Sequence, residues 1–589
     1  MASAAESVGP SAAFLGVEAS LTGRRWVGPS IEEERRAAAL AQRAGLEPAV
    51  AAILARRNVA PEEAQAFLAP SLRDLLPDPA LLRDMDAASA RLARALESRE
   101  RIAVFADYDV DGGASAALLI TWLRQMGHGA TLYVPDRIEE GYGPNVPAMA
   151  RLAEAHDLIV CVDCGTLSHA PIAAARGADV IVLDHHLAEA DLPECVAVVN
   201  PNRQDEPGDL GHLCAAGVVF LLLVDLNRRL RATGVTGPDL LAMLDLVALA
   251  TVADVAPLTG VNRAFVRQGL TVMARRQRPG LVALADVARL DRAPTCYHLG
   301  YVLGPRVNAG GRIGAADLGA RLLACESEAK AAALAARLDT LNTDRREIEA
   351  RVRDAALTQA EARGGDAALV WAAGEGWHPG VVGIVASRLK EHMNRPAVVI
   401  GFEGDAGKGS GRSVPGVDLG AAVQRLAAEG LIERGGGHRM AAGLSLAKAQ
   451  LEPAMARLTE LLARQGAASR GAGELRLDAV MMPGAAEPGL IERIEAAGPF
   501  GAAAPAPRFA FPAMRIRSAQ PVGEAHLRLS FSDGGPAMEA IAFDAARSGL
   551  DALQGHQGRP VHLAGRVDLN HWNGRTRVQL RLEDAAWAG

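Results

Sequence analysis

The chain has 589 residues and a net charge of -7, from 62 basic and 69 acidic residues. Hydrophobic residues make up 49% and charged residues 22%, as in ordinary globular proteins, and the length excludes a single hydrophobic core. We therefore expect about three to five domains, and any binding of a polyanion must depend on a local basic groove and not on the total charge.

Signals for a membrane span and for disulfides are weak. Residues 1–30 hold no charged segment followed by an apolar core, and no run reaches the roughly 18 apolar residues of a span. We therefore expect a cytoplasmic protein with no membrane partner. The six cysteines form no disulfide framework. Cys161 and Cys164 make a C-x-x-C pair without a second pair, which favours core residues over a zinc or redox site.

Residues 1–98 contain short helical patterns separated by proline-rich breaks. The expected helices cover residues 31–44, 49–57, 61–67 and 87–96. No cluster of reactive side chains occurs among them. We expect an N-terminal helical layer that packs on the next domain and has a structural role.

Residues 99–275 alternate apolar strands with helical patterns. The expected strands cover residues 103–106, 130–134, 158–162, 180–183 and 196–199, and the expected helices cover 114–126, 171–176, 215–230 and 240–250. This alternation predicts an α/β domain with a doubly wound parallel sheet. Ligands of such sheets bind outside the carboxyl ends of the strands.

Acidic and histidine side chains follow three of these strands, and one more acid follows the helix at 240–250. The set is Asp107, Asp109, Asp111, Asp163, Asp184, His185, His186 and Asp254. Each one alone is more often a turn former, a helix cap or a core residue, but three strands that end this way indicate a shared site. Carboxylates packed together need a cation, and carboxylate with imidazole suits Mn²⁺ or Mg²⁺ better than structural zinc. The number of ligands predicts two ions bridged by a carboxylate, the arrangement that hydrolyses phosphoesters.

Residues 276–363 are expected to link two globular parts. The segment 305–313 lies among four glycines and carries Arg306, Asn308 and Arg312, which fits a solvated loop or a loop that contacts phosphate. From 318 to 363 there is no proline, and leucine, isoleucine and valine recur at near-heptad spacing. That pattern predicts one long connector helix.

Residues 364–466 predict a second α/β domain. A helical segment with Ser387 and Arg388 follows WHPG at 377–380. Two glycine-rich segments follow, GKGSGRSVPG at 407–416 with Ser410 and Arg412, and GGGHRMAAG at 435–443 with His438. A glycine-rich segment by itself is weak evidence of a binding loop.

Residues 473–589 change to short alternating strands, expected at 474–480, 510–517, 526–530, 537–543, 560–567 and 575–582. Strands this regular predict a small barrel, for which the OB fold is the common five-stranded form. Arginines and aromatic residues are interleaved on them, as in binders of single-stranded nucleic acid. We expect Phe531 and Phe543 in the barrel core and Trp572, in the turn NHWNG, as the stacking residue.

Four motifs resemble those of the DHH phosphoesterase superfamily: DYDVDG at 107–112, VDCG at 162–165, DHH at 184–186 and TVADVAPL at 251–258. Within it, DYDVDG with NPN at 200–202, LCAAGVVF at 213–220 and GPRVNAGGRIG at 304–314 is similar to the RecJ family. The resemblance implies metal ligands at Asp109, Asp111, Asp163, His185 and Asp254, with Asp107 as a further candidate. It implies that Asp184 orients His185 and that His186 faces the scissile phosphate.

The same resemblance implies a function and partners. It implies a metal-dependent exonuclease that degrades single-stranded DNA from its 5′ end in repair and recombination, with a RecQ-type helicase and a single-strand-binding protein as partners, and we expect a monomer. The second α/β domain would be the DHH-associated domain, with its GGGH loop closing over the site. The implied nucleic-acid contacts are Arg306, Asn308, Arg312, Ser387, Arg388, Ser410, Arg412 and His438.

Two alternatives stay open. An enzyme of the same superfamily that acts on oligoribonucleotides or cyclic dinucleotides would generally be shorter and would lack the barrel. A non-catalytic DNA-binding replication factor with this fold would have lost metal ligands, and each of them is present in this sequence.

Overall fold

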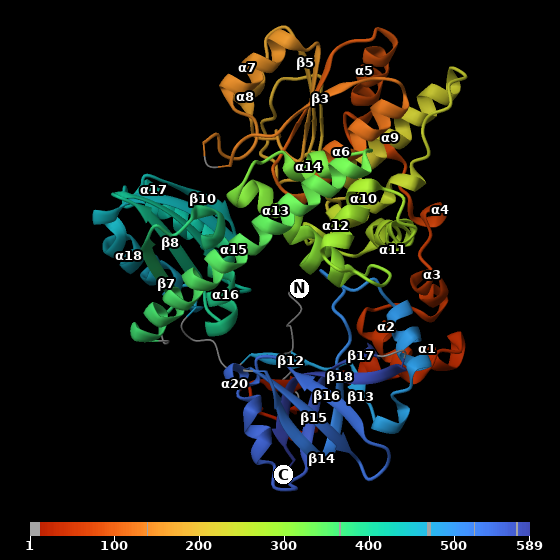
Figure 1. The fold of residues 1–589 in the computed structure, drawn as a ribbon, viewed down its shortest axis with the longest axis vertical. Coiled ribbons are helices and arrows are strands. Elements are labelled where there is room, and N and C mark those ends of the chain that lie inside the picture. The colour runs from red at the N-terminus through yellow and green to blue at the C-terminus, as the bar shows by residue number, and fades with distance from the viewer. Residues whose placement is uncertain are drawn as a thin grey trace, which may run out of the picture. The chain divides into compact units, whose positions relative to one another are not determined.

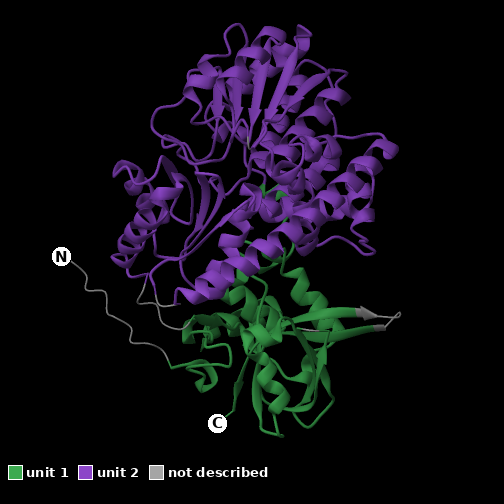
Figure 2. Cartoon of the chain, turned by 60° about the vertical axis from the view of Figure 1, so that its left-hand side comes forward, with its two compact units in different colours: residues 1–75, 471–589 green, residues 76–470 purple. Residues whose placement is uncertain are grey.

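The computed structural model describes residues 12–137, 139–364, 367–467, 473–523, 525–572 and 575–588, with the side chains of 571, 572 and 575 left out. The chain forms two compact units, one of residues 1–75 with 471–589 and one of residues 76–470 (Figure 2). Each unit has hydrophobic cores of its own. Among the described residues, no helix has both the length and the apolar character needed to cross a membrane.

The unit of residues 76–470 contains a parallel sheet in the order β3-β2-β4-β5-β6 (Figure 1). Its strands are β2 (Ile102–Ala106), β3 (Ala130–Tyr133), β4 (Leu158–Val162), β5 (Asp179–Leu183) and β6 (Ala197–Val199). Every residue of β2 and β4 is buried, because helices cover both faces. The parallel-sheet domain expected from the sequence is confirmed.

Two groups of helices cover this sheet. On one face, α7 (Val146–Ala155) and α8 (His169–Ala173) share a core with Phe105 and Ile159. On the other face lie α5 (Met85–Glu97), α6 (Val110–Gln125) and α9 (Ala215–Ala232). The helices α10 (Leu244–Ala253), α11 (Gly260–Ala274) and α12 (Pro279–Val287) follow and pack on other helices. Helix α6 is buried along nearly its whole length because α9 and α10 pack against it.

Residues 298–313 are helical, so the loop expected at 305–313 is wrong. A π-helix (His298–Leu303) runs into α13 (Gly304–Ile313), and α14 (Leu318–Leu323) follows. The glycines of α13 permit close packing: a Cβ on Gly311 would lie 2.7 Å from the carbonyl oxygen of Tyr108. The connector is also two helices and not one, since α15 (Glu328–Ala362) begins at Ser327, whose side chain accepts a hydrogen bond from the Lys330 amide.

A mixed sheet in the order β10-β11-β9-β8-β7 forms the second α/β domain. Its strands are β7 (Val370–Glu375), β8 (Ala397–Glu403), β9 (Ala406–Arg412), β10 (Arg434–His438) and β11 (Ala441–Ala447). Helices α17 (Leu419–Ala428) and α18 (Leu451–Ala463) cover one face, and α16 (Pro379–Met393) with the end of α15 packs on β7, β8 and β9 from the other. The GGGH segment, expected as a loop, is strand β10 of a hairpin with β11.

The C-terminal residues form a closed barrel in the order β14-β15-β16-β18-β17, with β17 paired back to β14. The strands are β14 (Phe509–Val522), β15 (His526–Ser532), β16 (Met538–Ala542), β17 (Val561–Trp572) and β18 (Arg575–Trp587), with β13 (Ala479–Val480) at the edge and helices α19 (Pro488–Ala496) and α20 (Ala545–Ser548). The OB-type barrel is thus confirmed. Strand β12 (Glu474–Arg476) lies outside it and pairs in parallel with β1 (Arg25–Val27).

The first helices of the chain pack on this barrel. They are α1 (Ile31–Ala44), α2 (Pro48–Arg56) and α3 (Ala64–Leu68), and the short helix α4 (Leu72–Leu75) follows them in the chain. Leu40, Ile53 and Leu54 share one core with Phe509 and Phe511 of β14. The single layer expected over residues 1–98 is therefore wrong: residues 12–75 belong with the barrel, whereas α5 packs on the parallel-sheet domain.

Candidate metal centre and adjoining cleft

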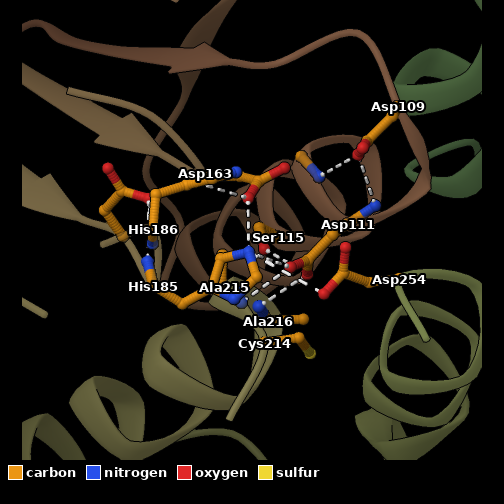
Figure 3. Close-up of polar contacts among 12 residues, drawn as sticks. Asp109, Asp111, Ser115, Asp163, His185, His186, Cys214, Ala215, Ala216 and Asp254 are labelled. Atoms are coloured by element: carbon orange, nitrogen blue, oxygen red, sulfur yellow. Dashed lines mark hydrogen bonds and ion pairs between the residues drawn. The ribbon is translucent and has the colours of Figure 1, made fainter. Parts of the chain in front are cut away.

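Four segments bring carboxylates and histidines to the carboxyl edge of the parallel sheet (Figure 3). One follows β2 at the start of α6, one follows β4, one follows β5 and one ends α10. They carry Asp107, Asp109 and Asp111; Asp163; Asp184, His185 and His186; and Asp254. The carboxyl ends of parallel strands meet at one edge, which is why residues far apart in sequence lie together here.

The turn between β2 and α6 positions its carboxylates through backbone amides. Asp109 Oδ1 accepts hydrogen bonds from the amides of Asp111 and Gly112 at 2.9 and 3.1 Å, which caps α6. A Cβ on Gly112 would lie 2.5 Å from the carbonyl oxygen of Asp107, so the turn requires glycine. The Asp111 carboxylate accepts hydrogen bonds from Ala215 and Ala216 at the start of α9, at 2.7 and 2.9 Å, and so joins two helices at the site.

His185 lies in the middle of the cluster. Its Nε2 is 3.2 Å from Asp163 Oδ1, 3.6 Å from Asp111 Oδ2 and 3.8 Å from Asp254 Oδ2. Three sets of side chains hold ligand atoms within 4.8 Å of one another: Asp107, Asp109 and Asp163; Asp111, His185 and Asp254; and Asp163, His185 and His186. Because Asp163 and His185 each belong to two sets, the cluster matches two neighbouring cations that share ligands.

Several buried atoms of the cluster have no hydrogen-bond partner. They are Asp107 Oδ1, Asp163 Oδ1 and His185 Nε2, counted over the residues that the structure describes. A buried polar atom left without a partner costs about 1–3 kcal/mol. These atoms are therefore placed where a cation would stabilise them.

Burial raises the pKa of the carboxyl groups of Asp107, Asp111, Asp163 and Asp254. Burial and then the charges of Asp111 and Asp109 raise the pKa of Asp254 to about 8. The same two neighbours add to the effect of burial on the pKa of Asp163. Ionised carboxylates in this space repel one another, and carboxylate with imidazole and no thiolate is a ligand set for Mn²⁺ or Mg²⁺. The residues therefore fit divalent cations.

Asp184 orients a different ring from the one expected. Its Oδ1 accepts a hydrogen bond from His186 Nδ1 at 2.8 Å, and its Oδ2 accepts one from the Thr166 amide at 3.1 Å. Burial raises the pKa of Asp184, but the hydrogen bonds and charge of these neighbours outweigh it and hold the pKa well below the usual range. Asp184 Oδ1 also accepts a hydrogen bond from the backbone amide of His185 at 2.7 Å, but it makes no such bond to the His185 ring among the described residues. The ring that Asp184 fixes is thus that of His186.

His186 lies at the open side of the cluster, where its side chain is 47% exposed. The hydroxyl of Tyr142 donates a hydrogen bond to the carbonyl oxygen of Asp163 at 2.9 Å and lies 3.1 Å from His186 Nδ1. Burial lowers the pKa of His186, but the hydrogen bond and charge of Asp184 raise it to about 9. The ring is therefore held from two sides as a hydrogen-bond donor beside the cluster.

A cleft of about 890 Å³ adjoins this site. Arg137, Gly141 and Tyr142 line it from the parallel-sheet domain, and residues of α16, β9, β10 and β11 line it from the mixed sheet. Tyr142 connects the cleft to the cluster through its contacts with Asp163 and His186.

Three guanidinium groups gather at the cleft and its wall. Arg312 donates a hydrogen bond to the carbonyl oxygen of Gly380 at 3.0 Å, and Arg412 donates one to Ser410 Oγ at 2.9 Å. Burial and then the charges of Arg137 and Arg345 lower the pKa of Arg312 to about 10, and burial and then Arg137 lower that of Arg412. Arginines that repel one another in this way indicate a site for an anion such as phosphate.

Comparison with known proteins assigns the family. Family models match at residues 101–251 (DHH family, N-terminal domain), 365–464 (DHHA1 domain) and 477–584 (RecJ OB domain). The single-stranded-DNA-specific exonuclease RecJ of Dickeya dadantii is 40% identical over 537 residues, which cover 87% of this chain and 92% of the relative. The chain belongs to the RecJ family. RecJ of Escherichia coli is 38% identical over 517 residues, with 84% and 88% covered.

Solved RecJ structures have the same fold. The crystal structure of RecJ from Thermus thermophilus in complex with Mn²⁺ matches with a TM-score of 0.79 at 30% identity, covering 95% of this chain and 79% of that chain. The complex of that RecJ with Mg²⁺ matches with a TM-score of 0.73 at 28% identity, covering 95% and 78%. Both ions are of the kind that the carboxylate and histidine cluster fits.

Of the nucleic-acid contacts that the RecJ resemblance implies, Ser410 lines the cleft, and Arg412 and Arg312 donate hydrogen bonds to the lining residues Ser410 and Gly380. Arg306 is engaged elsewhere, since its Nε donates a hydrogen bond to Asp339 Oδ1 at 2.8 Å. The side-chain oxygen of Asn308 is buried and has no hydrogen-bond partner among the described residues.

The remaining expected contacts are not brought to the cleft. Ser387 Oγ donates to the carbonyl oxygen of Gly383 inside α16, at 3.3 Å, and Arg388 pairs with Glu391 at 3.3 Å. His438 is exposed at the end of β10, and its Nδ1 accepts a hydrogen bond from the Met440 amide at 3.2 Å. The side chain of Trp572 lies outside the described residues.

Sequence reasoning missed three residues that shape this RecJ site. They are Tyr108, Arg137 and Tyr142. The Arg137 guanidinium lies over the Tyr108 ring, 5.1 Å from its centroid, and the Tyr142 ring packs edge-on against His186 at 5.5 Å. A signal was present, because Arg137 and Tyr142 lie in the loop after β3, and loops after parallel strands face the ligand in this class of sheet.

The RecJ barrel carries one aromatic residue in an unexpected place. Phe531 is fully buried, as expected, but Phe543 is 48% exposed, so its expected core role is wrong. Strand β16 buries Met538, Ala540 and Ala542 in alternation, so the next position, Phe543, faces outward. Its ring packs against His526, with centroids 5.2 Å apart, and the Arg581 guanidinium lies over it at 5.1 Å.

Proposed function

We propose that this chain is a metal-dependent exonuclease that degrades single-stranded DNA from its 5′ end. The observation that carries the proposal is the buried carboxylate and histidine cluster with unpartnered ligand atoms, next to a cleft lined by cations. The relatives are named single-stranded-DNA-specific exonucleases, which supports the substrate.

The proposed chemistry is phosphodiester hydrolysis with Mn²⁺ or Mg²⁺, for which two bound ions supply an activated water and stabilise the departing oxygen. Asp107, Asp109 and Asp163 would hold one ion, and Asp111, His185 and Asp254 would hold the other. His186, oriented by Asp184 and by Tyr142, donates a hydrogen bond to an oxygen of the scissile phosphate.

In this proposal the cationic cleft binds the 5′-terminal phosphate and thereby sets the direction of degradation. A terminal phosphate carries more charge than an internal one, and the guanidinium groups of Arg137, Arg312 and Arg412 with the Ser410 hydroxyl form a site suited to it. A strand whose 5′ phosphate is held in the cleft has its first phosphodiester bond near the metal cluster, because Tyr142 lines the cleft and also contacts Asp163 and His186 of the cluster. A cleft of this size also favours a single strand over a duplex.

The barrel is assigned to holding the rest of the strand. Phe543 and Arg581 present an aromatic face and a cation on its outer surface, the combination on which bases stack in single-strand binders. The cellular partners that we propose, a RecQ-type helicase that supplies single strands and a single-strand-binding protein, are supported by the family alone. We propose that the chain acts as a monomer in the cytoplasm, in DNA repair and recombination.

The test uses purified protein with Mn²⁺ and single-stranded DNA labelled at either end, beside a matched duplex, an RNA strand and a dinucleotide. We expect mononucleotide to be released first from the 5′ end of the single strand, and a chelator to abolish the release. Hydrolysis of the dinucleotide alone would favour an oligonucleotide hydrolase of the same superfamily. Tight binding without hydrolysis would favour a non-catalytic DNA-binding factor.

Two variants test the site. We expect His185→Ala and Asp163→Asn to lose hydrolysis at saturating Mn²⁺ and to keep binding of long single strands through the barrel. Full activity in either variant would refute the site assignment.

A further inference from the structure

One half of a face of the mixed sheet is open to the cleft. On this face α15 and α16 pack on β7, on β8 and on the part of β9 around Ser410, where a Cβ on Gly383 of α16 would lie 3.1 Å from Ser410 Oγ. Beyond it, residues 408–410 of β9 line the cleft together with residues of β10 and β11, and Arg137 and Tyr142 line it from the parallel-sheet domain. The side chains on this half of the face therefore contact any ligand that binds in the cleft.

The strand register arranges this half-face in rows. Arg434 pairs with Ser445, and Ser445 pairs with Lys408, so these three side chains form one row across β10, β11 and β9. The next row is Gly436, Gly443 and Ser410. Directly paired residues share a face, and residues two apart on a strand lie about 6.8 Å apart. The Lys408 row therefore lies one step beyond Ser410, on the side away from Arg412.

Gly436 and Gly443 place no side chain on the surface of the sheet that faces the cleft. A Cβ on Gly436 or Gly443 would meet no atom within 4 Å, and neither residue has a positive φ. Neither close packing nor backbone conformation requires glycine there. The missing side chains instead leave room for a ligand to approach the sheet.

The Lys408 row carries positive charge without a counter-charge. Lys408 and Arg434 are exposed, and neither forms an ion pair within the described part of the chain. Among the described residues that line the cleft, Glu433 is the one carboxylate, and it precedes β10 and lies outside the row. Lys408, Arg434 and the Ser445 hydroxyl, next to the sheet surface at Gly436 and Gly443, provide the hydrogen-bond donors of a phosphate site.

We infer that the row of Lys408, Ser445 and Arg434 is a second phosphate subsite, one step beyond the terminal-phosphate site at Ser410 and Arg412. The inference rests on the proposed function, because it takes a phosphate that lies 5′ to the terminal site. That group comes either from a 5′-triphosphate or from one further nucleotide. The enzyme then accepts triphosphorylated 5′ ends, or it releases dinucleotides as well as mononucleotides.

The experiment compares Lys408→Ala and Arg434→Ala with the full-length wild type. Arg464→Ala is the matched control, because it removes an exposed arginine at the end of α18, on the covered face of the same sheet. The single strands carry a 5′-monophosphate or a 5′-triphosphate, with radiolabelled nucleotides throughout to follow the released products and a 3′ fluorophore for the affinities. Two ratios are measured with Mn²⁺: kcat/KM for triphosphate over monophosphate, and dinucleotide over mononucleotide in the products. The affinities for both strands are also measured in a chelator, by fluorescence anisotropy.

We expect one of the two ratios to fall about tenfold in each cleft variant and to stay at the wild-type value in Arg464→Ala. A fall in the first ratio identifies the triphosphate as the source, and a fall in the second identifies a further nucleotide. The inference is overturned if neither ratio moves, or if all rates fall equally. If the wild type binds both strands but hydrolyses neither, the proposed function fails, and the ratio of affinities in chelator still decides on the subsite.

Discussion

Replacing Asp163 with asparagine should stabilise the metal-free protein while it abolishes hydrolysis. Asp163 is 1% exposed, and its Oδ1 has no hydrogen-bond partner among the described residues. A buried charge without compensation costs about 3–5 kcal/mol, and an amide with an unmet hydrogen bond costs about 1–3 kcal/mol. The substitution should therefore raise the free energy of unfolding by roughly 2 kcal/mol.

Asparagine is the suitable replacement because of the backbone. Asp163 has a φ of 61°, in the left-handed region that asparagine tolerates better than alanine. Asp163→Asn thus removes the charge with little change in backbone strain. A stability change can then be attributed to the carboxylate.

The assay is thermal unfolding in a chelator and in Mn²⁺. In the chelator we expect Asp163→Asn to melt a few degrees above the wild type. In Mn²⁺ the wild type should have the higher melting temperature. An ion at 100 times its Kd stabilises the wild type by about 2.7 kcal/mol, and the variant loses most of that binding.

Asp184→Asn is the matched control. Asp184 is also buried, at 2% exposed, but its oxygens accept hydrogen bonds from His186 and Thr166. We expect this variant to melt below the wild type in both conditions. If Asp163→Asn also melts below the wild type in chelator, then Asp163 is a satisfied buried residue and the reasoning about the metal centre is refuted.

Three further substitutions test the cleft, the barrel and the packing of α13. Arg137→Ala should lower kcat/KM about 10- to 100-fold for a strand with a 5′ phosphate and less for one with a 5′ hydroxyl, and equal losses would contradict the terminal-phosphate site. Phe543→Ala should weaken binding of long single strands, measured by anisotropy, by about 1–3 kcal/mol; an unchanged affinity would make the ring structural. Gly311→Ala puts a Cβ 2.7 Å from the Tyr108 carbonyl oxygen and should lower the free energy of unfolding by about 1–3 kcal/mol, whereas Gly129→Ala, which meets no atom within 4 Å, should not.

The parallel sheet was predictable because its strands are short and apolar between polar turns. Strand β4 has the bounds expected from the sequence, Leu158–Val162, and all of its residues are buried. Once the strands are placed, the carboxyl-edge rule brings Asp107, Asp163 and His185 together without any knowledge of side-chain geometry. Local periodicity and one rule of topology therefore account for most of the metal centre.

The wrong predictions depend on partners that are remote in sequence. Glycines in 304–314 fit a mobile loop or a closely packed helix equally well, and the contact with Tyr108, about 200 residues earlier, decides for the helix. The N-terminal helices likewise find their apolar partners in β14, more than 400 residues away. Local pattern gives the element in such cases, but the surface on which it packs must come from the structure.

The cleft shows why total charge was a poor guide to function. The net charge of -7 sums an acidic cluster and a basic cleft that adjoin each other in one unit. Among the residues that the structure describes, Asp107 Oδ1 and Asp163 Oδ1 have no hydrogen-bond partner, and burial and then the charge of Arg137 lower the pKa of Arg412. Opposite charges this close would neutralise each other by direct pairing if both served stability alone. Two aromatic rings contact these groups: Tyr108 lies under Arg137, and Tyr142 packs against His186. A phosphodiester strand with bound divalent cations would satisfy both sets at once, so the separation of the two charges is itself an argument for that substrate.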